Sequence, residues 1–191
     1  MEIVTKRFLL RDFVDGDLPA FAAYHADPRS LEFYETHEGK HSHAQALIEI
    51  FRKWAAERPR LNYQMAIVRR DETQTLVGCC GLRCKDLEPG NAELGIELAP
   101  DYWGRYGYAI EVMRALVDFG FSDLELKEIY GSTVSVNARI ARLARAYGTV
   151  AVERPTPARM VARGWKQVEF RIVRAQWEQG RLTIQSGGRR R

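Results

Sequence analysis

The chain has 191 residues, of which 46% are hydrophobic and 28% charged, and its formal net charge at pH 7 is +4. This composition excludes an intrinsically disordered chain, and no segment reaches the roughly 18 to 20 consecutive apolar residues of a membrane-spanning helix. The first residues carry no apolar segment typical of a secretory signal. We therefore expect a soluble, cytoplasmic protein that makes no membrane contact.

Most of the excess positive charge lies at the C-terminal end. Arg189, Arg190 and Arg191 follow a Ser-Gly-Gly spacer, and the net charge without them is +1. Because a nucleic-acid-binding protein carries its positive charge on the folded domain, we expect no nucleic-acid partner. Binding of nucleic acid through this tail stays an alternative. We expect residues 1–178 to form a single domain and residues 179–191 a basic, flexible tail.

Hydrophobic periodicity and turn residues divide the first half of the chain into strands and two helices. Apolar residues recur at helical spacing from Leu47 to Trp54, and the preceding segment Ser42–Gln45 fits a capping box. The expected elements are a strand over 5–11, a helix over about 15–25, a helix ending near residue 57, and strands over 63–68, 76–85 and 91–99.

The second half begins with a long amphipathic helix, in which polar and apolar residues form separate stripes. The expected elements are this helix over about 108–124, a strand over 128–136, a helix over 137–148, and closing strands over 150–153 and 168–173. So many adjacent strands exclude a doubly wound parallel sheet. The fold class is therefore α+β, a mixed α/β sandwich.

Two groups of residues have side chains that could bind metal ions. Cys79, Cys80 and Cys84 lie in one predicted strand, where neighbours point to opposite faces, and they form no Cys-x2-Cys pair. We interpret them as reduced core thiols. Three histidines spaced His-x3-His-x-His run from His37 to His43, which favours an exposed polar loop, with a metal site as the alternative. We expect no metal.

A glycine-containing segment joins the strand over 91–99 to the long helix that follows. Free backbone N–H groups in such a loop, together with the helix dipole, favour a bound phosphate. Gly104 and Gly107 permit close backbone approach, and Arg105 adds a positive charge. Alone, the segment is equally typical of a tight turn. It lacks the residues of the dinucleotide-binding and P-loop motifs.

The surroundings of this turn are more specific. Glu93–Ala109, followed by Val134–Asn137 and Leu143–Gly148, resembles the GNAT N-acetyltransferase superfamily, within it the branch that acetylates ribosomal-protein N-termini and small amines. The opening Lys6–Arg11 and the closing Gln176–Trp177 suit that branch. The resemblance covers nearly all of the predicted domain. It implies a GNAT-like fold, with a central, mostly antiparallel sheet flanked by helices, and transfer of an acetyl group from acetyl-CoA to an amine.

The resemblance also implies which residues contact the cofactor acetyl-CoA. They are Leu98, Gly104, Arg105, Tyr106, Gly107, Tyr108, Ala109 and Asn137. Leu98 would pair with the peptide-like pantetheine arm, and Asn137 would contact the same arm. The loop departs from the family signature, because Gly104 stands where Gln or Arg is expected. Equivalently, Tyr106 is a one-residue insertion, which alters the register of the loop.

Two carboxylates are the catalytic candidates. Glu93 and Glu97 lie on the same face of the predicted strand, about 13 Å apart along it. By the resemblance, Glu93 falls where some members carry a general base. Either carboxylate could relay a proton through water, and either could equally be a solvated strand residue. Ala144 and Ile140 stand at two positions where the resemblance places catalytic groups, so the general acid is unassigned.

Other residues could contact the cofactor or the acceptor. The predicted helix over 137–148 carries three arginines, Arg139, Arg142 and Arg145. They could reach the CoA 3′-phosphate or an acidic substrate, or they could form a solvated helix face. The segment around the second predicted helix often shapes the acceptor pocket in this fold; it carries Tyr34, His37, His41 and Trp54. Tyr147, Tyr130 and Ser135 are nearby substitutes for the missing acid, although Tyr147 has the spacing of a core residue.

We expect an acetyl-CoA-dependent N-acetyltransferase that acetylates a primary amine of a small molecule by direct attack in a ternary complex. An α-amino group has a pKa of about 7.7 to 8.0, so an acceptor of this kind is partly neutral at pH 7 without a strong base. Acetylation of a protein or peptide N-terminus is one alternative. A non-catalytic acyl-CoA-binding module is another, favoured by the altered loop. The protein could form a homodimer, although no interface can be identified in the sequence.

Overall fold

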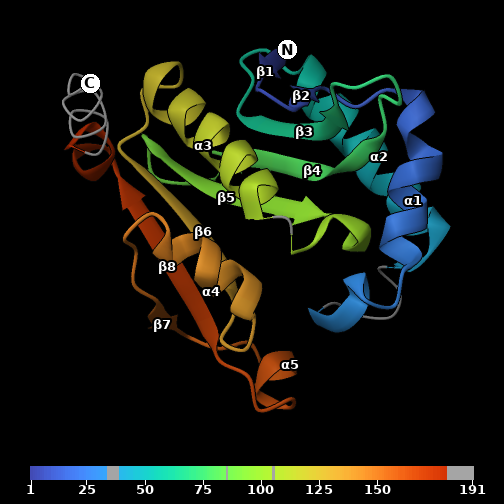
Figure 1. Cartoon of the computed structure of the whole chain (residues 1–191). Helices are drawn as coiled ribbons and strands as arrows, with labels where there is room; N and C mark the ends of the chain where they lie inside the picture. The colour runs from blue at the N-terminus through green and yellow to red at the C-terminus, as the bar shows by residue number, and fades with distance from the viewer. Residues whose placement is uncertain (34–38, 85, 105, 180–191) are drawn as a thin grey trace, which may run out of the picture.

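An eight-stranded sheet with the order β1-β2-β3-β4-β5-β6-β8-β7 forms the frame of the molecule (Figure 1). The computed structural model describes residues 1–33, 39–84, 86–104 and 106–179. The strands are β1 (Glu2–Val4), β2 (Phe8–Arg11), β3 (Asn62–Arg69), β4 (Leu76–Arg83), β5 (Asn91–Leu98), β6 (Glu128–Val134), β7 (Val152–Arg154) and β8 (Gln167–Val173). Neighbouring strands are antiparallel except β5 and β6, which are parallel. The predicted mixed α/β class with a mostly antiparallel sheet is confirmed.

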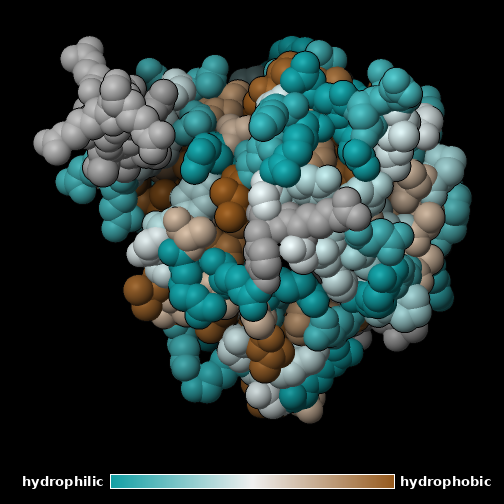
Figure 2. Space-filling view, viewed as in Figure 1, coloured by the Kyte–Doolittle hydropathy of each residue, from teal (hydrophilic) through white to brown (hydrophobic). Residues whose placement is uncertain are grey.

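Helices cover both faces of the sheet. They are α1 (Leu18–Ala26), α2 (His41–Ala56), α3 (Tyr106–Ser122), α4 (Ala138–Arg145) and the short α5 (Ala158–Val161), with 3-10 turns η1 (Asp15–Asp17), η2 (Ser30–Phe33) and η4 (Pro100–Tyr102). Helices α1 and α2 pack on one face, and α3 and α4 on the other (Figure 1). The face that carries α3 and α4 is mostly hydrophilic, with scattered apolar side chains between the polar ones (Figure 2).

The central strands supply side chains to both layers because successive residues point to opposite faces. In β3, Met65 and Ile67 join the core beneath α3, whereas Ala66 and Val68 join the core beneath α1 and α2. A strand covered on both faces appears in the sequence as a continuous apolar run. The cysteines of β4 follow the same rule, since Cys79 and Cys80 belong to different core clusters. The thiols are free, as expected.

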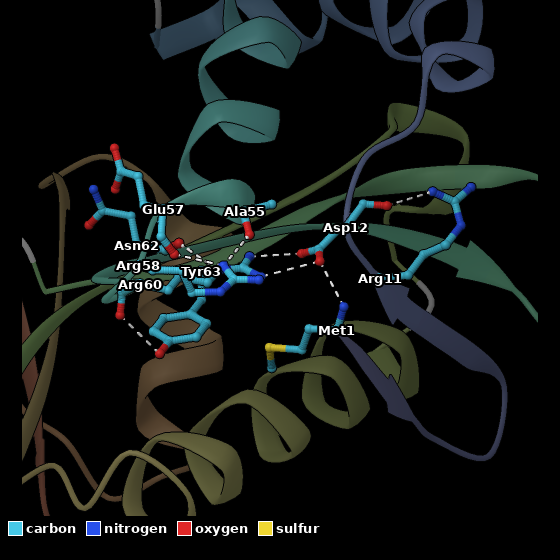
Figure 3. A network of polar contacts seen from close by, with 9 residues as sticks. All are labelled: Met1, Arg11, Asp12, Ala55, Glu57, Arg58, Arg60, Asn62 and Tyr63. Atoms are coloured by element: carbon cyan, nitrogen blue, oxygen red, sulfur yellow. Dashed lines mark hydrogen bonds and ion pairs between the residues drawn. The ribbon is translucent and has the colours of Figure 1, made fainter.

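A network of polar contacts fixes the N-terminal hairpin to the rest of the sheet (Figure 3). The N-terminal ammonium of Met1 lies 2.7 Å from Oδ2 of Asp12, and Arg60 Nη2 lies 2.7 Å from Oδ1 of the same carboxylate. Although burial opposes it, hydrogen bonds from Arg60 and the N-terminus lower the pKa of Asp12. Arg60 precedes β3, so this carboxylate ties the open end of the β1–β2 hairpin, opposite its turn, to the segment before β3.

Some expected element boundaries were wrong. Helix α2 begins at His41 with Lys40 as its N-cap, which makes no side-chain capping bond. Ser42 therefore lies inside the first turn, and the predicted capping box is not formed. The 3-10 turns and the short elements β1 and α5 were not predicted, because three or four residues show no usable periodicity.

The C-terminal part of the described chain packs on α3. Residues 174–179 form a last helical segment, in which Trp177 Nε1 donates to Asp118 Oδ1 at 2.6 Å and the indole ring lies 5.2 Å from Phe121. Residues 180–191 of the expected tail lie outside the described residues, so the boundary near residue 178 stays a prediction. Within the described segments, no helix combines the length and apolar character needed to cross a membrane.

Candidate active site

The parallel strands β5 and β6 separate part-way along their length. They pair only from Asn91 to Glu93, after which β6 continues beside β8 as far as Val134. Strand β5 keeps its other neighbour, β4, up to the pair of Gly78 with Leu98. The result is a wedge between β5 and β6 that opens toward the end of β5 where η4 and α3 follow (Figure 1).

One edge of β5 faces this wedge with its backbone polar groups. The carbonyl oxygen of Leu94 points to β6, where it lies 3.3 Å from the position of a Cβ on Gly131. The carbonyl of Glu97 points the other way, 2.1 Å from a Cβ placed on Gly78 in β4. Because backbone groups alternate along a strand, Leu94 and every second residue after it present N–H and C=O to the wedge. A peptide-like chain could add to this edge as a further strand would.

The predicted glycine turn connects this edge to α3. Trp103 Nε1 donates to the carbonyl oxygen of Leu98 at 2.7 Å, which fixes the start of the turn. Gly104 has φ +76°, a left-handed conformation that favours glycine, and no atom lies within 4 Å of a Cβ placed there. Arg105 lies outside the described residues. The turn therefore leaves open space directly before the helix.

The first turn of α3 contains the other residues that were assigned to the cofactor. The first backbone N–H groups of an α-helix have no intrahelical acceptor, so Tyr106 and Gly107 direct theirs out of the helix end. Tyr108 and Ala109 pack their side chains against the core, and the ring of Tyr108 lies 5.0 Å from that of Phe8. Tyr108 and Ala109 can therefore contribute backbone groups and helix dipole to an anion rather than side-chain contacts.

Asn137 caps helix α4. Its Oδ1 accepts a hydrogen bond from the backbone N–H of Ile140 at 3.2 Å, and its Nδ2 donates to Thr133 Oγ1 at 3.1 Å. An Asn at this position satisfies a backbone donor that the helix itself leaves free. The side chain is thus held at the end of β6 beside the wedge. Its contact with the pantetheine arm stays a prediction.

Arg139 bridges two segments rather than forming part of a solvated helix face. Its guanidinium lies 4.0 Å over the ring of Trp103, and its Nη2 lies 2.7 Å from Oε2 of Glu32 in η2. Phe33 of the same turn lies 5.4 Å from the guanidinium. The turn before α3, the start of α4 and η2 therefore meet at this arginine. Arg145 lines a cavity of about 250 Å³ beneath α4, together with Asn137 and Ser135.

Glu93 stands where β5 and β6 separate. It is about one-third exposed, and its Oε2 lies 3.3 Å from Nη2 of Arg83 on β4. In the register of the parallel pair its neighbour is Tyr130. Burial first, and then the carboxylates of Glu93 and Glu169, raise the pKa of Tyr130, which is therefore protonated at neutral pH. The carboxylate and a phenol that can donate a proton thus lie side by side.

A cavity of about 320 Å³ opens beside Glu93. Its lining residues are Trp54, Asn62, Arg83, Asp86, Leu87 and Glu93. Trp54 was expected near the acceptor from its place in the second helix, and it lines this cavity. His41 begins α2, and Tyr34 and His37 lie outside the described residues. The cavity combines an aromatic wall with two carboxylates and with Arg83, which pairs with Glu93, so Asp86 and Trp54 are the groups that would attract a cation.

Glu97 belongs to a different cluster on the same face of β5. Its Oε2 lies 3.4 Å from the hydroxyl of Tyr24 and 3.5 Å from Nε2 of His25, both on α1. The thiol of Cys79 donates to the same oxygen at 3.8 Å. Burial, with the carboxylate of Glu97 next, raises the pKa of Cys79, so this thiol stays protonated. Tyr24 and His25 were missed because they lie 73 and 72 positions before Glu97 in the sequence.

The positions expected to hold a general acid carry none. Ala144 is buried beneath α4, and Ile140 packs beside it. Tyr147 lies against the core, and burial raises its pKa to about 12. Three residues were considered from the sequence as replacements for the general acid. Of these, Tyr130 is the one that lies next to a catalytic candidate, Glu93.

Comparison with known proteins agrees with this geometry. The sequence model of the acetyltransferase (GNAT) domain matches residues 7–150. The chain belongs to this family. It is therefore an acyltransferase of a family that uses acetyl-CoA. It is 32% identical over 139 residues to the uncharacterized N-acetyltransferase YoaA of Bacillus subtilis, which covers 73% of this chain and 77% of that protein.

Solved structures share the fold of this GNAT acetyltransferase. A Vibrio cholerae protein provisionally named a ribosomal-protein-serine acetyltransferase matches with a TM-score of 0.70 at 23% identity, over 91% of this chain and 97% of that chain. Spermidine N-acetyltransferase from Vibrio cholerae, in complex with CoA and spermine, matches with a TM-score of 0.68 at 20% identity, over 89% and 97% of the two chains.

The described residues contain no candidate metal site. Across the part of the chain that the structure describes, no three His, Cys, Asp or Glu side chains form a group that could hold a metal ion. His41 and His43 lie in the first turn of α2 rather than in the expected polar loop, and His37 lies outside the described residues.

Proposed function

We propose that this GNAT acetyltransferase transfers an acetyl group from acetyl-CoA to a primary amine of a small molecule, within a ternary complex. The observation that carries the proposal is the separation of β5 from β6 after Glu93. It leaves the backbone edge of β5 between the first turn of α3 and two carboxylates. A single ligand would fit this arrangement if its anionic end lay at α3, its peptide-like arm along β5 and its reactive thioester near the carboxylates.

The residues present suit such a donor. Gly104 leaves open space before α3, and Gly107 supplies a free backbone N–H group beside the guanidinium of Arg7, so a diphosphate could bind at the start of α3. Tyr106, Tyr108 and Ala109 contribute helix backbone, and Arg105 would add a charge. Leu98 and its alternate neighbours on β5 would pair with the pantetheine amides, with Asn137 at the opposite side of the wedge. When bound, acetyl-CoA supplies an activated acyl group with a thiolate leaving group.

Two residues at the point of strand separation would handle the protons. Glu93 would accept a proton, directly or through water, from the amine nitrogen as it forms the new N–C bond. As the C–S bond breaks, Tyr130 would donate its phenolic proton to the departing sulfur. The raised pKa of Tyr130 keeps that proton available at neutral pH. Glu97 is the second candidate base, and its oxygen is already shared among Tyr24, His25 and Cys79.

The cavity beside Glu93 supports a small acceptor. Its volume of about 320 Å³ is in the range of small-molecule sites. Trp54 and the carboxylate of Asp86 would attract a cationic amine before it loses its proton. The spermidine N-acetyltransferase of Vibrio cholerae, which shares this fold and was solved with CoA and spermine, also acts on a small amine. A protein N-terminus is the alternative acceptor, suggested by the structural neighbour named for a ribosomal protein.

Calorimetric titration with acetyl-CoA and CoA tests the donor, on the wild type and on Gly107→Trp. Micromolar binding to the wild type that the substitution abolishes would place the donor at the glycine turn. Failure of the wild type to bind either compound would overturn the enzyme proposal in favour of another binding role. An acceptor screen with small amines and N-terminal peptides then separates the two acceptor classes.

Two further features accompany the proposal. A cytoplasmic location suits the free thiols Cys79 and Cys80, because reducing compartments keep such groups unpaired. A homodimer is expected by resemblance alone, and sedimentation equilibrium would decide between one and two copies. Neither feature enters the proposed chemistry.

A further inference from the structure

Arg7, in the turn before β2, lies against the first turn of α3. Its guanidinium lies 4.5 Å from the ring centroid of Tyr108. A Cβ placed on Gly107 would stand 2.7 Å from Nη2 and 3.1 Å from Nη1 of this arginine. A side chain at position 107 would therefore displace the end of this arginine. The turn that carries Arg7 belongs to the hairpin that Asp12 anchors (Figure 3).

One carboxylate fixes the orientation of Arg7. Glu111 Oε2 accepts from Arg7 Nε at 2.6 Å, and Oε1 accepts from the backbone N–H of Arg7 at 2.7 Å. Although burial opposes it, hydrogen bonds from Thr5 and from Arg7 lower the pKa of Glu111, so the carboxylate stays charged. A guanidinium held through Nε keeps both terminal nitrogens together as a fork.

The two terminal nitrogens of Arg7 lie beside the start of α3. Nη1 and Nη2 are the atoms nearest to Gly107, at the helix end where free backbone N–H groups emerge. Among the described residues in the first turn of α3, none is acidic. The arginine side chain is 41% exposed, so an incoming anion can reach it. A planar fork beside helix amides has the geometry for two phosphate oxygens.

We propose that Arg7 binds the diphosphate of the acyl-CoA donor with Nη1 and Nη2, while Glu111 is the positioning residue that aims it. The proposal rests on the proposed function, because it assigns the anion to that donor. Arg7 thus supplies a side-chain contact at a glycine turn whose register differs from the family signature. The contact comes from a segment 104 residues away from Glu111 in the sequence.

Binding of CoA, of dephospho-CoA and of acetyl-pantetheine to Arg7→Gln tests the proposal. Dephospho-CoA keeps the diphosphate but lacks the 3′-phosphate, and acetyl-pantetheine lacks both. We expect the dissociation constants of CoA and dephospho-CoA to rise by the same factor, about 10- to 100-fold. The affinity for acetyl-pantetheine, measured by competition or as kcat/KM, should stay within about twofold of the wild type.

Two control variants separate binding from folding. Glu111→Gln breaks the same ion pair but keeps the fork, so it should bind CoA much more tightly than Arg7→Gln does. Arg52→Gln removes an exposed arginine that pairs with Asp15 on the opposite face, and should leave all three affinities unchanged. Thermal unfolding of each variant verifies that it is folded at the temperature of the titration.

Several results would overturn the proposal. Equal loss of affinity for all three compounds in Arg7→Gln would mean that Arg7 has a structural role. Loss for CoA but not for dephospho-CoA would assign the arginine to the 3′-phosphate instead. If the wild type binds neither CoA nor dephospho-CoA, the proposed function itself fails. Wild-type binding with an unaffected Arg7→Gln rejects the role of Arg7 alone.

Discussion

His25 Nε2 lies 3.5 Å from Oε2 of Glu97, which connects helix α1 directly to strand β5. The same carboxylate oxygen accepts from Tyr24 and from Cys79. Glu97 therefore has enough partners for a structural role in holding α1 on the sheet. Glu93, on the same strand face, has Arg83 beside it and a cavity in front of it. The two carboxylates should respond differently to substitution.

We predict that Glu93→Gln lowers kcat about 100-fold, because the general base is lost while the shape of the site is kept. Affinity for CoA should not change, since the donor contacts lie elsewhere. Steady-state kinetics with the best acceptor, together with calorimetry, measures both quantities.

Glu97→Gln provides the comparison. It should reduce kcat less than Glu93→Gln does, and it should lower stability by about 1 kcal/mol through the weakened contacts with α1. A larger loss of kcat in Glu97→Gln than in Glu93→Gln, at unchanged stability, would exchange the two assignments.

Tyr130→Phe tests the proton donor. The variant keeps the ring that packs beside Glu93 but removes the phenolic proton. We expect kcat to fall about 100-fold with acceptors whose reaction is limited by departure of the thiolate. A donor with a more acidic leaving thiol should recover much of the rate, because such a thiolate needs no proton. Tyr147→Phe is the matched control, since that tyrosine lies in the core behind α4. Equal losses in both variants would argue against the assignment.

The layers of the fold could be predicted from the sequence because periodicity reports burial. The continuous apolar run of β3 and the apolar stripe of α3 are local patterns, and each identified its element. The failure at the start of α2 has a physical reason. A Ser three residues before a Gln matches the capping-box pattern, but the helix starts two residues earlier and has Lys40 at its N-cap. Local pattern does not decide between such neighbouring starts.

The site could be predicted only where its residues are close in sequence. Glu93, Glu97 and the glycine turn lie within one segment, and the predicted shared face of the two glutamates is confirmed. Tyr24, His25 and Arg7 reach the site through tertiary packing, for which the sequence carries no periodic signal. The contact between Arg7 and Glu111 requires the N-terminal hairpin to lie beside the start of α3, a feature of topology rather than of spacing.

Substitution of Gly78 tests how closely β4 packs against β5 beneath the site. A Cβ at this position would stand 2.1 Å from the carbonyl oxygen of Glu97 and 2.9 Å from the Cα of Leu98, both backbone atoms. The backbone of β5 would have to move, so Gly78→Ala should destabilise the protein by about 3 kcal/mol and weaken CoA binding.

Gly16→Ala is the control for this substitution, because no atom lies within 4 Å of a Cβ placed there. Urea unfolding of both variants gives the comparison. Similar stabilities for the two variants would show that β4 and β5 can separate at low cost.

We expect the charge of Glu169 to make the stability of the protein depend on pH. Its buried carboxylate accepts from Arg154 Nη2 and from Arg171 Nε, each at 2.6 Å. Burial opposes ionisation, but these two arginines lower the pKa of Glu169 below its ordinary value. A carboxyl group with a depressed folded-state pKa stabilises the protein above its unfolded pKa of about 4.3. That stabilisation is lost as the pH falls through the lower folded-state pKa.

Glu169→Gln should therefore lower the free energy of unfolding by about 2 kcal/mol at neutral pH, where it leaves two arginines facing a neutral amide. At about pH 3 the difference from the wild type should shrink, because the wild-type carboxyl group is then losing its charge. Urea unfolding at both pH values measures this. Glu153→Gln removes an exposed partner of Lys166 and should change little at either pH. A difference for Glu169→Gln that stays constant with pH would mean that packing or hydrogen-bond geometry, rather than charge, holds β7 and β8 together at this residue.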